Sequence, residues 1–189
     1  MIDNFYEETF KGVDYTKISI VKGEYDSCSF VDCNFDSIHA SNIQFLECEF
    51  INCNFSNTIV ENTAFKDVIF EECKLVGVKF NECDPFLLAF QFNKCQLNFA
   101  SFYKLKLQNI IFNNCSLEEV DFVEANLSKG MFDDCNLKRA VFDNTNLEKT
   151  NFVSSYNFDI NPARNLVKGA KFSQQNVQGL LNSFQIIVE

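Results

Sequence analysis

The sequence predicts an all-β fold in which one chain winds into a four-sided solenoid. Large apolar residues recur at every fifth position, small residues recur two positions before them, and the pattern stacks in columns whose members lie four repeats apart. A helix has a period of 3.6 residues and a plain strand a period of 2, so neither explains a period of five. Two inward side chains followed by polar outward ones describe a chain that turns a corner in each repeat.

The large inward series begins at Phe5. Every fifth residue from there to Phe80 is a large or branched apolar residue, with Ala40 as the one exception. After a slip of two positions the series resumes at Leu87 and continues to Phe152. No shorter element explains so long a regular series, so we expect one continuous repeat array rather than several domains.

The columns test the four-sided coil. If one turn takes four repeats, every fourth repeat lies on the same side, and one such column is entirely Phe: Phe10, Phe30, Phe50, Phe70, Phe92, Phe112, Phe132 and Phe152. The small position on the next side gives a column of cysteines: Cys33, Cys53, Cys73, Cys95, Cys115 and Cys135. A two-residue register break near residues 81–87 keeps both columns aligned. Pro85 lies in that break. Pro has no backbone N–H to donate, and outside the ladder no strand hydrogen bond is lost.

The chain has 9 Cys, so disulfide formation and metal binding are the first functions to consider. All of them, including Cys28, Cys48 and Cys83, fall in the small inward register, where a reduced thiol acts as a small apolar side chain. A zinc site needs converging ligands, which a linear column does not provide. We therefore expect packing cysteines, no disulfides, no metal and no cofactor.

Charge and sequence ends limit the partners. The net charge is −10, so duplex DNA and anionic membranes are poor direct partners, and a basic protein surface is a better one. The N-terminus lacks the features of a signal peptide, and no segment is long enough for a membrane helix. We expect a soluble cytoplasmic protein.

The repeats resemble those of the pentapeptide-repeat family, whose motif is A(D/N)LXX. Examples are Cys33-Asn34-Phe35-Asp36-Ser37 and Ala125-Asn126-Leu127-Ser128-Lys129. The resemblance covers residues 13–154. It implies a right-handed quadrilateral β-helix with four pentapeptides per coil. A length on the order of 35 Å follows from about seven coils at about 4.8 Å each.

Residues 1–12 are interpreted as an N-terminal cap. Asp3 and Glu8 occupy the small inward register there, and burying a carboxylate is costly. We therefore expect the first coil to close only at Val13.

Residues 155–189 are interpreted as a C-terminal cap, and the apolar face of this segment is in addition a candidate dimer contact. After Phe152 the period fails, and Asp159-Ile160-Asn161-Pro162 predicts a turn. A short helix is predicted next, capped by Ser173, and a short strand ends the chain. The candidate cap and dimer residues are Val177, Leu180, Leu181, Phe184, Ile186 and Ile187.

This tail resembles that of McbG-type microcin immunity proteins and, more broadly, of the Qnr and MfpA proteins. The resemblance implies a homodimer joined through its C-terminal ends. It also implies DNA gyrase and topoisomerase IV as partners, which such proteins bind by mimicking DNA. The implied role is protection of these enzymes from a poison such as a microcin or a quinolone.

One side of the predicted rod is moderately acidic. The candidate partner-binding residues are Asp32, Glu47, Glu49, Asp67, Glu71, Glu72, Asp133 and Asp134. B-DNA carries about one charge per 1.7 Å, or roughly 20 over 35 Å, so the net charge of the chain gives about half that density. The alternative is a structural or protein-interaction solenoid with another, unknown partner, for which the charge only maintains solubility.

Enzymatic functions find little support in the residues. The single histidine, His39, falls in an outward position without a predictable catalytic partner. The inward register denies access to the thiols, and the glycines do not form a phosphate-binding loop. We expect a protein that binds rather than catalyses.

Overall fold

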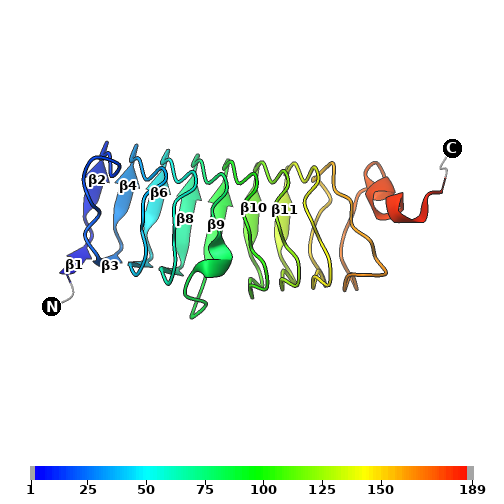
Figure 1. Ribbon diagram of the computed structural model, residues 1–189. Helices are drawn as coiled ribbons and strands as arrows, with labels where there is room; N and C mark the ends of the chain where they lie inside the picture. Colours follow the sequence, from blue (N-terminus) through cyan, green and yellow to red (C-terminus); the bar gives the residue numbers. More distant parts are fainter. Residues whose placement is uncertain (1–2, 187–189) are drawn as a thin grey trace.

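The computed structural model describes residues 3–186, which form a straight rod with the two termini at opposite ends (Figure 1). All strand pairs are parallel, and the rod confirms the predicted four-sided β-helix. None of the helical segments between residues 3 and 186 is long and apolar enough to cross a membrane.

Two sheets run along the rod. A four-stranded sheet has the order β1-β3-β5-β7, and a seven-stranded sheet has the order β11-β10-β9-β8-β6-β4-β2. The first contains β1 (Asp3–Tyr6), β3 (Gly23–Asp26), β5 (Gln44–Leu46) and β7 (Ala64–Lys66). The second contains β2 (Thr9–Lys11), β4 (Ser29–Val31), β6 (Glu49–Ile51), β8 (Val68–Glu71), β9 (Phe90–Asn93), β10 (Ile111–Asn113) and β11 (Met131–Asp133). Isolated bridges such as Asp14↔Asn34 and His39↔Ile59 link the coils on the other two sides.

The strand register confirms the predicted columns. Phe30 pairs with Phe50, four repeats further on, whereas the pairing of Phe70 with Phe92 spans four repeats and the register slip. The rings stack within the column, with centroids 4.8 Å apart for Phe30–Phe50 and 5.2 Å for Phe92–Phe112. Neighbouring columns meet edge to face, as for Phe50 and Phe55 at 5.0 Å and 89°. Both geometries are favourable for aromatic rings, so the core is a lattice of aromatic contacts.

Most corners of the coil place a residue in the left-handed region. Asp32, Asn52 and Asn114 have φ values of 55°, 52° and 52°. Asn and Asp adopt this conformation more readily than other residues with a side chain. The abundance of Asn in outward positions is therefore partly a backbone requirement of the corners.

The register break forms a loop that projects from the rod below β9 (Figure 1, green). It follows the short 3-10 helix η1 (Phe80–Glu82). The expected inward position of Leu87 is wrong, because its side chain is 64% exposed. Phe90 fills the core instead, with its ring 5.0 Å from Phe80 and 5.5 Å from Phe65. The inserted pair of residues does not fit a coil of four repeats, so the chain bulges outward before it rejoins the ladder.

The ladder begins earlier than expected. Strand β1 pairs with β3 from Asp3 onward, and β2 pairs with β4, so the first coil is formed before Val13. Asp3 and Glu8 avoid the expected desolvation cost because no preceding coil covers them, and both are exposed. The role of residues 1–12 as a cap remains an interpretation.

The ladder also continues past Phe152. Asn151 pairs with Lys171, and the Phe172 ring stacks on Phe152 with centroids 5.3 Å apart. The sides of this last coil between Phe152 and Phe172 are irregular, so the five-residue period cannot be followed there in the sequence.

The predicted C-terminal helix is wrong in type. Residues there form two short 3-10 helices, η2 (Val177–Leu180) and η3 (Asn182–Phe184). The Asn176 backbone N–H donates to the Ser173 hydroxyl oxygen at 3.2 Å, but this bond lies in the turn before η2, and Asn176, the N-cap of η2, makes no side-chain capping bond. Gly and Asn are weak α-helix formers, and both occur in this segment. Ile186 lies outside any strand, and Ile187 and Val188 lie outside the described residues.

Candidate protein-interaction surface

The cysteines are core residues. All nine are free and buried. The Cys53 thiol donates a hydrogen bond to the Phe30 carbonyl of the previous coil, as the Thr145 hydroxyl does to Phe122. Burial raises the pKa of the Cys48 thiol to about 12, so it stays protonated at neutral pH. A buried, protonated thiol is a poor nucleophile and a poor metal ligand.

Metal chemistry gains no candidate from the geometry. Among residues 3–186, no three His, Cys, Asp or Glu side chains converge as ligands would. His39 is exposed on one of the bridged sides. The acidic residues predicted as candidates lie on the outer surface.

The fold brings the eight predicted acidic residues to one side of the rod. Glu49, Glu71 and Asp133 lie in β6, β8 and β11 of the seven-stranded sheet. The remaining five occupy left-handed positions at the two corners that flank this sheet: Asp32, Glu47, Asp67, Glu72 and Asp134. Seven of the eight side chains are exposed, and Glu71 is half-buried.

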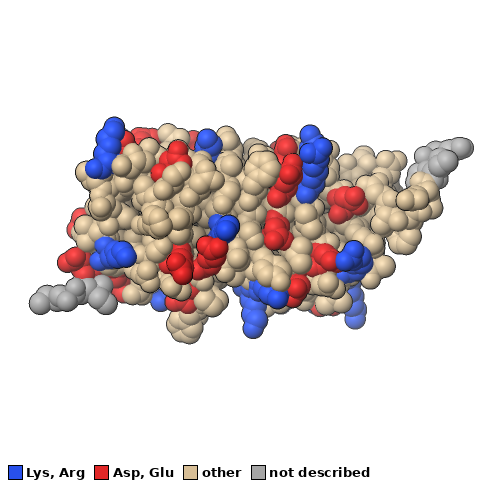
Figure 2. Space-filling view, viewed as in Figure 1, with Lys and Arg blue, Asp and Glu red and all other residues tan. Residues whose placement is uncertain are grey.

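These residues form two groups rather than one continuous stripe. We call Asp32, Glu47, Glu49, Asp67, Glu71 and Glu72 the N-terminal acidic group, and Asp133 and Asp134 the C-terminal acidic pair. Strands β9 and β10 lie between them and carry outward Gln91, Asn93, Ile111 and Asn113. Three ladder steps, about 14 Å, separate β8 from β11. Figure 2 accordingly shows acidic side chains among wide uncharged areas, with basic ones beside some of them.

Lys94 partly neutralises the N-terminal acidic group. Its Nζ lies 3.0 Å from a Glu72 carboxylate oxygen and 3.2 Å from one of Glu71. The hydrogen bond to Glu72, followed by that to Glu71, raises the pKa of Lys94. Exposed ion pairs of this kind are weak, so a stronger basic partner can displace Lys94.

The charge is also unequal along the rod. Residues 1–94 contain 16 acidic and 7 basic residues, a net charge of −9, whereas residues 95–189 contain 10 acidic and 9 basic residues, a net charge of −1. Acidity is thus a property of the N-terminal half. The positions of the candidate residues alone did not reveal this asymmetry, although the net charge of each half of the sequence would have revealed it.

The C-terminal end exposes part of its apolar surface. Val177, Phe184 and Ile186 are 39%, 54% and 57% exposed. Leu180 packs against the core, and Leu181 is half-buried. The tail therefore covers the last coil with some apolar residues and presents others to solvent. Ile187, predicted with them, lies outside the described residues.

The sequence matches the family model described as the pentapeptide repeat region, over residues 23–91 and 86–157. The chain belongs to the pentapeptide-repeat family. A comparison with curated protein sequences found no match.

Solved structures of other pentapeptide-repeat proteins share its fold. QnrB1, a plasmid-mediated fluoroquinolone resistance protein, is similar in one of its trypsin-treated variants with a TM-score of 0.74 and 15% identity, over 99% of this chain and 92% of that one. The full-length form gives a TM-score of 0.56 and 14% identity, over 97% and 100% of the two chains. At such identities the likeness concerns the fold.

One surface feature of this pentapeptide-repeat protein was not predicted from its sequence. The projecting loop exposes Phe86 and Leu87, each 64% exposed. The five-residue period predicted Leu87 in the core, so it did not indicate that this side chain is exposed. Pro85 in a register break was the available indication that the chain leaves the ladder there.

Proposed function

We propose that this pentapeptide-repeat protein binds DNA gyrase and topoisomerase IV as a DNA mimic and protects them from a poison such as a microcin or a quinolone. Its role is binding rather than catalysis. The observation that carries the proposal is the N-terminal acidic group, six carboxylates on one side of a rigid ladder.

The charge density of this group supports mimicry. Its six residues belong to three successive levels of the seven-stranded sheet, those of β4, β6 and β8 and their corners. Two ladder steps between these levels span about 10 Å. B-DNA carries about six charges over that length, at one per 1.7 Å. The density of carboxylates alone is therefore close to the charge density of DNA; Lys94 offsets part of it, and the average over the rod is about half.

The rigidity of the support favours this function as well. Five of the six carboxylates, all but that of Asp67, project from residues whose backbone is hydrogen-bonded to a neighbouring coil, as at Asp32, whose N–H donates to the Ile51 carbonyl at 3.0 Å. A surface that is already ordered loses little conformational entropy on binding. Complementary charge also speeds association with a basic groove.

We also propose that the protein forms a homodimer through its C-terminal end. The exposed apolar side chains of Val177, Phe184 and Ile186 support this, because a second copy would remove them from water. Light scattering of the wild type and of Phe184→Asp tests it. A dimer that becomes a monomer on substitution supports the proposal, and a wild-type monomer at all concentrations rejects it.

The function is tested with purified gyrase and topoisomerase IV. We expect the protein to inhibit supercoiling at high concentration and, at lower concentration, to reduce the DNA cleavage caused by a quinolone or by a microcin. Binding is expected to weaken as salt increases. The absence of binding, of inhibition and of protection would reject the proposal and favour another basic protein partner.

A further inference from the structure

The projecting loop, residues 81–89, holds apolar side chains in water. Phe86 and Leu87 are each 64% exposed. Leu87 also has a φ of 56°, a left-handed conformation that is unfavourable for a residue with a large side chain. Neither feature stabilises the isolated chain. Two adjacent large apolar side chains held in water are a reason to ask what the position does.

The loop is held in place. The Asp84 N–H donates to the Thr63 carbonyl at 3.0 Å, and the Phe86 N–H donates to the Asp84 carboxylate at 2.9 Å. The Lys66 Nζ lies 5.7 Å from the centre of the Phe86 ring, as in a cation–π contact. Leu87 is therefore presented by a fixed turn rather than by a loose segment.

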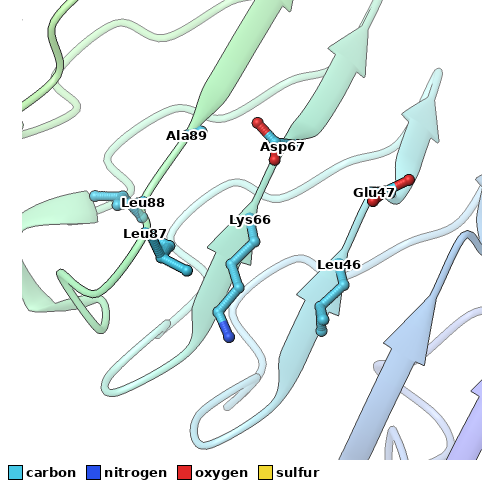
Figure 3. Close-up of a pocket in the computed structure, with 7 residues that line it drawn as sticks. All are labelled: Leu46, Glu47, Lys66, Asp67, Leu87, Leu88 and Ala89. Atoms are coloured by element: carbon cyan, nitrogen blue, oxygen red, sulfur yellow. The ribbon is translucent and has the colours of Figure 1, made fainter.

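A recess of about 410 Å³ lies beside this turn. Leu46, Leu87 and Leu88 form its apolar walls, and Glu47, Lys66 and Asp67 line it as well (Figure 3). The register break creates it, because Ala89 occupies the level after Asp67 and has only a methyl side chain there. Figure 3 shows Leu46, Lys66 and Leu87 pointing to one side, and Asp67 pointing away from them.

We propose that this recess binds a large apolar side chain of a protein partner that is flanked by Lys or Arg. The volume suits one or two such side chains, and an apolar anchor in a pocket is the usual centre of a protein interface. The charges around it suit basic flanking residues, because Glu47 and Asp67 are exposed whereas Lys66 is engaged by Phe86. Asp26 adds a further carboxylate, since it pairs with Leu46 one step toward the N-terminus.

The site extends beyond the proposed DNA mimicry, since DNA offers no apolar anchor. It also does not depend on which basic protein is the partner. The N-terminal acidic group and the recess share Glu47 and Asp67, so one partner can contact both.

The probe is a fluorescein-labelled hexapeptide with a Leu-Phe centre between two arginines on each side, and binding is measured by fluorescence anisotropy. Two matched peptides replace the centre with Ala-Ala or the arginines with glutamates. We expect the first peptide to bind at least tenfold more tightly than either matched peptide. Equal binding of the Ala-Ala peptide, or of the glutamate peptide, would overturn the proposal.

The protein variants separate binding from folding. Leu87→Asn relieves the left-handed strain, so we expect its melting temperature to equal or exceed that of the wild type while peptide affinity falls at least tenfold. Phe99→Asn is the matched control, because Phe99 is 58% exposed with a φ of 63° on another corner of the rod. Its peptide affinity should not change. Unchanged affinity of Leu87→Asn, or an equal loss in Phe99→Asn, contradicts the proposal.

The peptide assay contains no topoisomerase. Peptide binding without any gyrase binding would leave the recess proposal standing and reject the proposed function. If instead the wild type binds gyrase, Leu87→Asn binds it equally well and the peptide does not bind, the recess proposal is rejected and the proposed function stands.

Discussion

At the scale of single residues, the small inward position has a hydrogen-bonding role as well as a packing role. Thiols of Cys53 and Cys73 and the hydroxyl of Thr145 each donate to the carbonyl of the residue 23 positions earlier, one coil back. The Asn165 amide does the same to Phe142. Sulfur, hydroxyl and amide donors are thus interchangeable here, which explains why nine cysteines need no chemistry of their own.

The buried thiols predict a loss of stability at alkaline pH. Burial raises the pKa of Cys48 from about 9 to about 12 and also raises the pKa of Cys83. Above pH 9 the unfolded chain releases these protons while the folded chain keeps them, so the free energy of unfolding decreases from about pH 9 upward. Thermal melts between pH 7 and pH 11 measure this. A Cys48→Val variant should show a smaller alkaline decrease, and an identical decrease would contradict the assignment to this thiol.

The corner residues predict a stabilising substitution. Asn109 and Lys129 occupy the same corner one coil apart, with φ values of 64° and 61°. Because Asn tolerates this conformation better than Lys, Lys129→Asn should raise the free energy of unfolding by about 1 kcal/mol. Asn109→Lys should lower it by a similar amount. Chemical denaturation of both variants measures the pair, and changes of the same sign would contradict the explanation.

At the scale of elements, the sequence predicts whatever repeats and misses whatever interrupts the repeat. The Phe column from Phe10 to Phe152 and the cysteine column were predicted correctly, because period and burial coincide in them. The loop that exposes Leu87 was missed, since the slip admits several places for the chain to leave the ladder. Phe172 was missed because the irregular sides before it conceal that it continues the Phe column one coil after Phe152. The acidic candidates share one side of the rod, but their division into two groups depends on the uncharged strands β9 and β10 between them.

The C-terminal element depends on one glycine. A Cβ added at Gly179 would lie 2.3 Å from the Phe158 carbonyl oxygen and 2.6 Å from its ring. The Ile160 N–H also donates to the Gly179 carbonyl at 2.9 Å, so the tail docks on the last coil at this point. Gly179→Ala should detach the tail without unfolding the ladder.

Hydrogen exchange of the backbone amides measures this detachment. We expect faster exchange from residue 158 onward and unchanged exchange between β3 and β10. Gly12→Ala is a useful control, because nothing lies within 4 Å of its added Cβ, although its φ of 65° makes it mildly strained. Normal protection of the Gly179→Ala tail would show that the last coil has more room than the contacts indicate.

At the scale of the whole molecule, the rod is polarised. Its N-terminal half carries a net charge of −9 and its C-terminal half −1, and the exposed apolar residues of the tail lie at the less charged end. If the proposed dimer forms through that end, the two acidic halves lie at the outer ends of a longer rod. Like charges are then far apart, so self-repulsion does not oppose association.

This polarity predicts which acidic residues matter for a basic partner. Asp32→Asn with Glu49→Gln removes two charges from the N-terminal acidic group, where the density of carboxylates is close to the charge density of DNA. Asp133→Asn with Asp134→Asn removes two charges from the C-terminal acidic pair. The first variant should weaken gyrase binding several-fold and reduce its salt dependence, because the lost charges act together with four neighbours. The second should have a smaller effect.

Lys94→Gln tests the role of the N-terminal acidic group in the opposite direction, because it removes a positive charge instead of negative ones. It removes the cation that pairs with Glu71 and Glu72, so it should strengthen gyrase binding and increase its salt dependence. Affinities at two salt concentrations, with melting temperatures to check folding, measure all three variants. Equal losses from both acidic variants would mean that total charge, and not its arrangement, governs binding. A Lys94→Gln variant that binds no better would mean that the carboxylates it frees do not face the partner.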